Sequence, residues 1–179
     1  MKSKKRKKSN VEWIVIVTAL AFIISVIMGF FGEIILSNVG LVISIIITLI
    51  FIILGIVFDI IGVATTAANI HVFNSMASKK VSGASVAVKL VNNASRVSSI
   101  CCDVVGDVCG VASGSSGVSI AAILILKFKL NSLFVGALVT AIISMLTIGG
   151  KAIGKEFAIK KSTKIVHSVG IIISTFGIK

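Results

Sequence analysis

Proline is absent from this sequence of 179 residues, which also contains only six acidic residues and two histidines. Without proline, a break in any helix has to come from glycine or serine. The two histidines, His71 and His167, fall at the start of a loop and in a predicted interfacial segment. No nucleophile is paired with a base beside a plausible pocket, so we do not expect an enzyme.

Cysteine is also scarce, and all three residues, Cys101, Cys102 and Cys109, fall in one apolar segment. In such a segment a thiol packs as a small apolar group. A disulfide is not implied, because neighbouring side chains on a helix point in different directions. A site for a soft metal would need more ligands of the same kind.

Apolar residues, in contrast, make up 56% of the chain, and the mean hydropathy is +1.15. A soluble domain of this size could not bury so much apolar surface. Crossing a bilayer takes about 20 apolar residues. The sequence therefore predicts an all-α membrane protein with four transmembrane helices plus amphipathic juxtamembrane helices. The four uncharged runs that predict the spans are Trp13–Gly32, Ile34–Phe58, Val108–Leu126 and Leu130–Gly150.

The net charge of +12 does not indicate nucleic-acid binding, because the basic residues lie beside the predicted spans. Four spans would place sixteen basic residues on one side and only Lys127 and Lys129 on the other. Positive residues favour the cytoplasmic side and bind anionic headgroups. We therefore expect a multi-pass protein of the cell membrane, with both termini cytoplasmic and the lipid bilayer as its partner.

Along the chain we predict three parts: a basic cytoplasmic tail at 1–10, an N-terminal transmembrane helix at 11–36, and a transmembrane domain at 37–179. Cytoplasmic juxtamembrane helices are expected within that domain at about 70–97 and 151–179. In the first of these, Ala84, Val88 and Val91 recur at helical spacing, with Lys89 and Asn92 among the polar positions. The last apolar run, 165–178, is short for a span and is expected to be interfacial or re-entrant.

Glycine and serine are concentrated in the third predicted span. The string Ser113–Gly117 could break the helix and free backbone carbonyls for cations. Gly106, Gly110 and Gly114 recur every four residues, which instead favours close packing of continuous helices. Both interpretations are kept.

Two of the six acidic residues, Asp103 and Asp107, lie one helical turn apart in this third segment, and Asp59 ends the second. Carboxylates inside a bilayer are costly and usually functional. The three could meet in one inward-facing pocket and hold a cation, for which Mg²⁺ or Ca²⁺ suits the oxygen donors. The alternative is that the aspartate pair lies solvated at the interface or pairs with Arg96. The further candidate ligands are Thr65, Thr66, Asn69, Ser113 and Ser115.

Three stretches resemble the transmembrane domain of the CorC/CorB and cyclin M (CNNM) family of magnesium transporters. DIIGVATTAAN is similar to the end of the family's first helix, and SGASVAVKLVNNASRVSSICCDVVGD to its juxtamembrane helix and the start of its second helix. LTIGGKAIGKEFA is similar to its third helix running into a lysine-bearing motif. The resemblance covers roughly residues 41–165, so that the span at 13–32 would be an addition.

The resemblance implies a divalent-cation transporter-like domain, with Mg²⁺ as a bound or transported ion and no covalently bound cofactor. The family's paired asparagines would correspond to Asp103 and Asp107. Its serine-rich turn would fall at Gly62 and Ala64, and its glutamate near Lys151. The family's cytoplasmic regulatory modules have no counterpart, so nucleotide regulation is not expected.

The resemblance also implies a homodimer formed through membrane helices, for which the ridge of Gly106, Gly110 and Gly114 is suited. Another class of function fits the small size and the basic N-terminus as well. It is a non-transporting accessory protein or a pore-forming protein of the holin or immunity type. A proton-coupled carrier that uses the aspartate pair as a relay is a third hypothesis.

Overall fold

The structure is a computed structural model that describes residues 2–37, 39–129 and 131–176, with side chains described within 12–30 and from 39 onward. Every regular element in these ranges is a helix. The helices are α1 (Lys2–Ser37), α2 (Leu41–Ala67), α3 (Ile70–Ser78), α4 (Ala84–Asn92), α5 (Ala94–Ser98), the π-helix η1 (Ser99–Gly106), α6 (Asp107–Phe128), α7 (Ser132–Lys160) and α8 (Ser162–Thr175).

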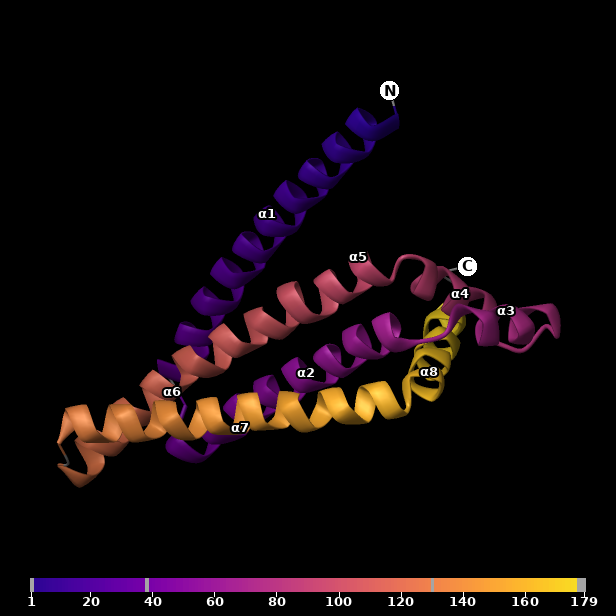
Figure 1. Ribbon diagram of the computed structural model, residues 1–179. Coiled ribbons are helices and arrows are strands. Elements are labelled where there is room, and N and C mark those ends of the chain that lie inside the picture. The colour runs from indigo at the N-terminus through magenta and orange to yellow at the C-terminus, as the bar shows by residue number, and fades with distance from the viewer. Residues whose placement is uncertain (1, 38, 130, 177–179) are drawn as a thin grey trace.

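Three long helices, α2, α6 and α7, pack against one another, and α1 leans on α6 and η1. Figure 1 shows that the short helices α3, α4 and α8 gather at one end of this bundle. Four segments are long and apolar enough to cross a membrane, which confirms the predicted all-α membrane fold. They are Glu12–Phe30, Leu41–Ala67, Ala94–Phe128 and Ser132–Lys160.

The helices extend beyond the uncharged runs that predicted them. The helix α1 begins at Lys2, so the basic segment expected as a separate tail is helical. Similarly, α2 runs past Asp59 to Ala67, and α7 runs past Lys151 to Lys160. Lysine and arginine are good helix formers, a single aspartate costs well under about 1 kcal/mol, and no proline intervenes, so nothing in the sequence ends these helices at the charged residue.

The segment predicted as a juxtamembrane helix at about 70–97 folds as α3, α4 and the short α5, the last of which begins the third span. Asn69 starts α3, because its side-chain oxygen accepts a hydrogen bond from the His71 amide at 2.9 Å. The amphipathic pattern of α4 is confirmed: Ala84 is buried, while Lys89 and Asn92 are exposed.

The predicted helix break at Ser113–Gly117 was wrong, because α6 is continuous from Asp107 to Phe128. The hydroxyl of Ser113 donates to the carbonyl of Gly110, and that of Ser116 donates to the carbonyl of Ala112. Such bonds to the preceding turn leave the helix intact. The departure from α-helical geometry lies earlier, at η1.

Glycines allow the long helices to approach closely. A Cβ atom on Gly55 of α2 would lie 3.2 Å from the Cβ of Cys109 and 3.4 Å from the carbonyl oxygen of Gly106. The interpretation of close packing therefore holds for Gly106. Gly110 and Gly114 face open space instead. Of the three glycines in the predicted ridge, these two remain available for the predicted dimer contact.

The C-terminal region predicted at 151–179 is divided between the end of α7 and the separate helix α8. The helix α8 packs on α4 and on the end of α2. There Val166 joins Ala64, Phe73, Ala87 and Ala158 in a buried apolar cluster. The run at 165–178 is thus a docked helix over its described part, not a re-entrant loop.

Gly83 and Gly170 bring α8 close to α4. Gly83 has a φ of +75°, a conformation that residues with a Cβ atom rarely adopt. A Cβ on Gly170 would lie 2.6 Å from the carbonyl oxygen of Gly83. The His167 Nε2 atom lies 3.0 Å from the Ser82 carbonyl oxygen at the same contact.

Candidate functional site

Charged residues of three different helices lie at a similar depth in the bundle. With a rise of about 1.5 Å per residue, Asp59 lies about 27 Å, Asp107 about 31 Å and Lys151 about 28 Å from the far end of its own helix. A hydrocarbon core is about 30 Å thick. If the apolar parts of α2, α6 and α7 fill that core, all three residues lie at one of its boundaries.

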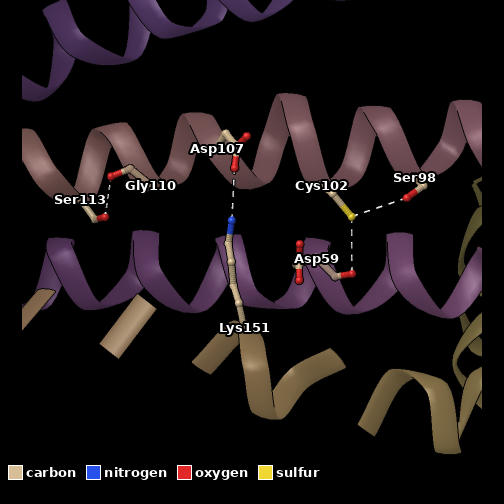
Figure 2. Close-up of polar contacts among 7 residues, drawn as sticks. All are labelled: Asp59, Ser98, Cys102, Asp107, Gly110, Ser113 and Lys151. Carbon is tan, nitrogen blue, oxygen red and sulfur yellow. Dashed lines mark hydrogen bonds and ion pairs between the residues drawn. The ribbon is translucent and has the colours of Figure 1, made fainter. Parts of the chain in front are cut away.

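Asp59 is the buried member of this group, with only 4% of its surface exposed. Its Oδ2 atom is fully buried and has no hydrogen-bond partner. The thiol of Cys102 points toward α2 and donates to the backbone carbonyl of Asp59 at 3.7 Å (Figure 2). A buried oxygen without a hydrogen-bond partner is unfavourable, and a cation bound at Oδ2 would compensate it.

Asp107 differs from Asp59, because it forms an ion pair with a lysine side chain. The ammonium of Lys151, on α7, lies 3.3 Å from a carboxylate oxygen of Asp107. The Lys151 side chain is only 20% exposed and crosses α2 to reach this partner, whereas that of Asp107 is 70% exposed (Figure 2). The Lys151 ammonium also lies 3.6 Å from where a Cβ atom on Gly106 would be, so this glycine leaves room for it.

Asp103 is exposed and faces α1. It lines a cavity of about 370 Å³ together with Trp13, Val17 and Ser99. Among the described side chains no ion pair involves Asp103. The guanidinium of Arg96, the alternative partner considered for the aspartates, instead lies 4.9 Å from the centre of the Trp13 ring.

The polar side chains predicted as further ligands form bonds within their own helices. Thr65 donates to the carbonyl of Ile61, and Ser113 and Ser115 bond to carbonyls one turn back, as does Thr66 at the end of α2. The oxygen of Asn69 is used to cap α3. Each hydroxyl oxygen can still accept a hydrogen bond, but none of these hydroxyls donates to Asp59.

The structure therefore does not gather the predicted ligands into one pocket. No group of three or more His, Cys, Asp and Glu side chains within the described ranges could hold a metal ion. Asp59 is buried, whereas Asp103 and Asp107 are exposed, so the shared inward-facing pocket expected for the three carboxylates is wrong. The one-turn spacing predicted that Asp103 and Asp107 share one face of the third span, but it could not predict their surroundings: Asp103 lines the cavity against α1, whereas Asp107 pairs with Lys151 of α7.

Sequence reasoning missed η1 and Lys151. The π-helix includes Cys101, Cys102 and Asp103 and ends where Asp107 begins α6. Such segments are rare and frequently mark functional sites. No proline or repeated motif signals one here. The sequence did show that Lys151 directly follows an apolar run. We predicted that its side chain contacts lipid headgroups, not that it pairs with Asp107.

The other half of the bundle is apolar. A cavity of about 230 Å³ between α2, α6 and α7 is lined by Ile45, Ile52, Ile120 and Ile143, among other residues. The buried hydroxyl of Thr48 at its edge donates to the carbonyl of Ser44. Apart from Thr48, the residues that line this cavity are apolar.

Comparisons with protein-family models, with curated proteins and with solved structures each return no match.

Proposed function

We propose that this chain is a multi-pass membrane protein that binds and carries a divalent cation, with Mg²⁺ as the favoured ion and Asp59 as its ligand within the bundle. The observation that carries the proposal is the buried Oδ2 atom of Asp59, which has no partner. A bound cation compensates such a charge. Magnesium suits a single protein carboxylate, because it keeps several of its water molecules and is often held by only one or two carboxylates.

The order of the helices supports the same proposal. The resemblance to CorC and CNNM transporters implies a first helix, cytoplasmic juxtamembrane helices, and two further spans. In the chain, α2 is followed by α3 and α4, and then by the third span and α7. The ligand proposed here differs from the family's asparagine pair, because Asp107 already has the ammonium of Lys151 as its counter-ion.

Transport by purified protein in liposomes that contain a Mg²⁺-sensitive dye tests the proposal. We expect Mg²⁺ uptake by the unmodified protein and a loss of about tenfold or more in Asp59→Asn, since ligand-shell changes commonly cost that much. The matched control is the Asp103→Asn/Asp107→Asn double variant, which should keep most of the uptake.

Four results would count against this proposal. Release of a large trapped dye would indicate a pore, and the absence of both uptake and leakage would indicate an accessory protein. Equal uptake by the unmodified protein and Asp59→Asn would remove Asp59 from the mechanism. Uptake that depends on a pH gradient without any divalent cation would favour the proton-coupled carrier.

We also propose that the end of the bundle that carries α3, α4 and α8 is cytoplasmic, in a cell membrane whose anionic headgroups meet the lysines at this end. Exposed lysines, including Lys79, Lys89 and Lys155, lie there, whereas Lys127 and Lys129 lie near the opposite turn. In a variant without native cysteines, a cysteine at Asn131 should react with an impermeant maleimide added to intact cells. A cysteine at Ser82 should react only after the cells are opened, and the reverse pattern would invert the topology.

A further inference from the structure

Lys151 forms a polar connection between α7 and the third span that the proposed transport does not use. Its ammonium lies 3.3 Å from a carboxylate oxygen of Asp107, and its side chain crosses α2 to reach that partner (Figure 2). Among the described residues no other hydrogen bond or ion pair joins α7 to the third span. Deeper in the bundle α7 packs on α6 through apolar contacts, such as that of Ile143 with Gly117.

This connection passes close to the level of Asp59. Gly150 of α7 packs against Ile56 of α2, because a Cβ atom on the glycine would meet the isoleucine side chain. Both helices run toward the end of the bundle that carries α3, α4 and α8 (Figure 1). Lys151 comes one position after this glycine, and Asp59 comes three positions after this isoleucine, so the two residues lie within about one helical turn of each other along the bundle. In the view of Figure 2 the Asp59 carboxylate lies between the Lys151 ammonium and the Cys102 thiol.

The charge at Asp59 acts directly on this connection. An ionised carboxylate there is negative and attracts the Lys151 ammonium into the passage between α7 and the third span. A divalent cation bound to that carboxylate makes the local charge positive, so the same ammonium is repelled. The pair with Asp107 resists only weakly, because 70% of the Asp107 side chain is exposed and exposed ion pairs contribute little.

We propose that the ion pair of Lys151 with Asp107 is a latch, which fixes α7 against the third span and opens when a cation binds at Asp59. This inference rests on the proposed function, because that function supplies the cation. Once the latch is open, the long Lys151 side chain extends toward the headgroups instead. The end of α7 that carries Lys151 then moves away from the third span, and the apolar contact of Ile143 with Gly117 serves as the pivot.

The distance between α7 and α6 tests the latch. In the full chain without native cysteines, nitroxide spin labels are attached at the exposed positions Ile153 and Val111 through the substitutions Ile153→Cys and Val111→Cys. Double electron–electron resonance then measures the distance between the labels in liposomes with EDTA or with Mg²⁺. We expect Mg²⁺ to raise the population with the longer distance about two- to fivefold, which is the factor that an exposed ion pair contributes.

Lys151→Gln in this labelled chain should show the longer distance with and without Mg²⁺, because it lacks the ammonium of the latch. Asp107→Asn removes the exposed partner and should have the same effect, so the test does not depend on the folding of one variant. The matched control is Lys155→Gln, which removes an exposed lysine one turn later on α7 and should keep the response to Mg²⁺. Asp59→Asn should not respond to Mg²⁺.

The short distance in both Lys151→Gln and Asp107→Asn with EDTA would overturn the latch. Mg²⁺ uptake by the labelled chain without any change in the distance would overturn it as well. A longer distance in Lys151→Gln, together with no Mg²⁺ uptake by the unmodified protein, would support the latch and reject the proposed function. The failure of one is thus distinguishable from the failure of the other.

Discussion

Asp59→Asn is expected to raise the melting temperature of the purified protein in the presence of EDTA, although it removes the proposed ligand. Asp59 is 96% buried and its Oδ2 atom has no hydrogen-bond partner, so the unmodified protein without a cation carries the cost of this buried, unpartnered oxygen. A neutral amide of nearly the same volume lowers that cost. We expect a gain of about 1–2 kcal/mol, which corresponds to roughly 2–8 °C for a chain of this size.

Added Mg²⁺ is expected to raise the melting temperature of the unmodified protein but not that of Asp59→Asn. Binding to the folded state stabilises it by about 2.7 kcal/mol at a concentration of one hundred times Kd. The unmodified protein should therefore melt at a higher temperature when Mg²⁺ is added, and Asp59→Asn should not respond. Thermal unfolding followed by circular dichroism, with EDTA and with Mg²⁺, measures both effects.

Asp103→Asn is the control, since this aspartate is exposed and its replacement should change the stability by less than about 0.5 kcal/mol while the response to Mg²⁺ remains. A lower melting temperature for Asp59→Asn in EDTA would show that the carboxylate is compensated by the protein. A response to Mg²⁺ that survives in this variant would place the cation elsewhere.

Gly170→Val is expected to detach α8 from α4. A Cβ atom at this position would lie 2.6 Å from the carbonyl oxygen of Gly83 and 3.3 Å from the Cβ of Ala87. Neither contact involves a flexible side-chain end, so the two helices must separate. We expect a loss of about 1–3 kcal/mol, which is typical of overpacking at a close contact.

Limited trypsin digestion in detergent measures this effect, because the exposed lysines Lys79, Lys80 and Lys160 flank the contact. Cleavage there should become much faster in Gly170→Val. Gly149→Val is the control, since a Cβ atom on Gly149 meets nothing within 4 Å. Equal digestion of the two variants would contradict the role of the glycine pair in holding α8.

Hydropathy predicted the four spans because a bilayer requires continuous apolar runs. Such a run can be recognised in one segment of sequence without knowing its tertiary contacts. The ends of the helices were less predictable. Charged residues such as Asp59 and Lys151 interrupt an apolar run without interrupting a helix, since helix continuation depends on backbone geometry and the absence of proline. The predicted spans therefore stopped at the charged residues, whereas α2 and α7 continue beyond them.

The candidate site was predicted only in part. The sequence identified Asp59, Asp103 and Asp107 as unusual, but spacing along a helix gives no information about which face a neighbouring helix covers. The pairing of Asp107 with Lys151 joins residues 44 positions apart and depends on the narrow passage beside Gly55 and Gly106. Such a contact follows from packing in three dimensions and has no local pattern.

The uninterrupted course of α7 makes it a stiff rod that joins both ends of the molecule. Its 29 residues span about 43 Å. A swing of about 5° around one tip displaces the opposite tip by about 4 Å, which is most of the height of one helical turn. A single residue separates α7 from α8. Any tilt of α7 that opens the apolar cavity between α2, α6 and α7 therefore also shifts α8 at the other end of the bundle.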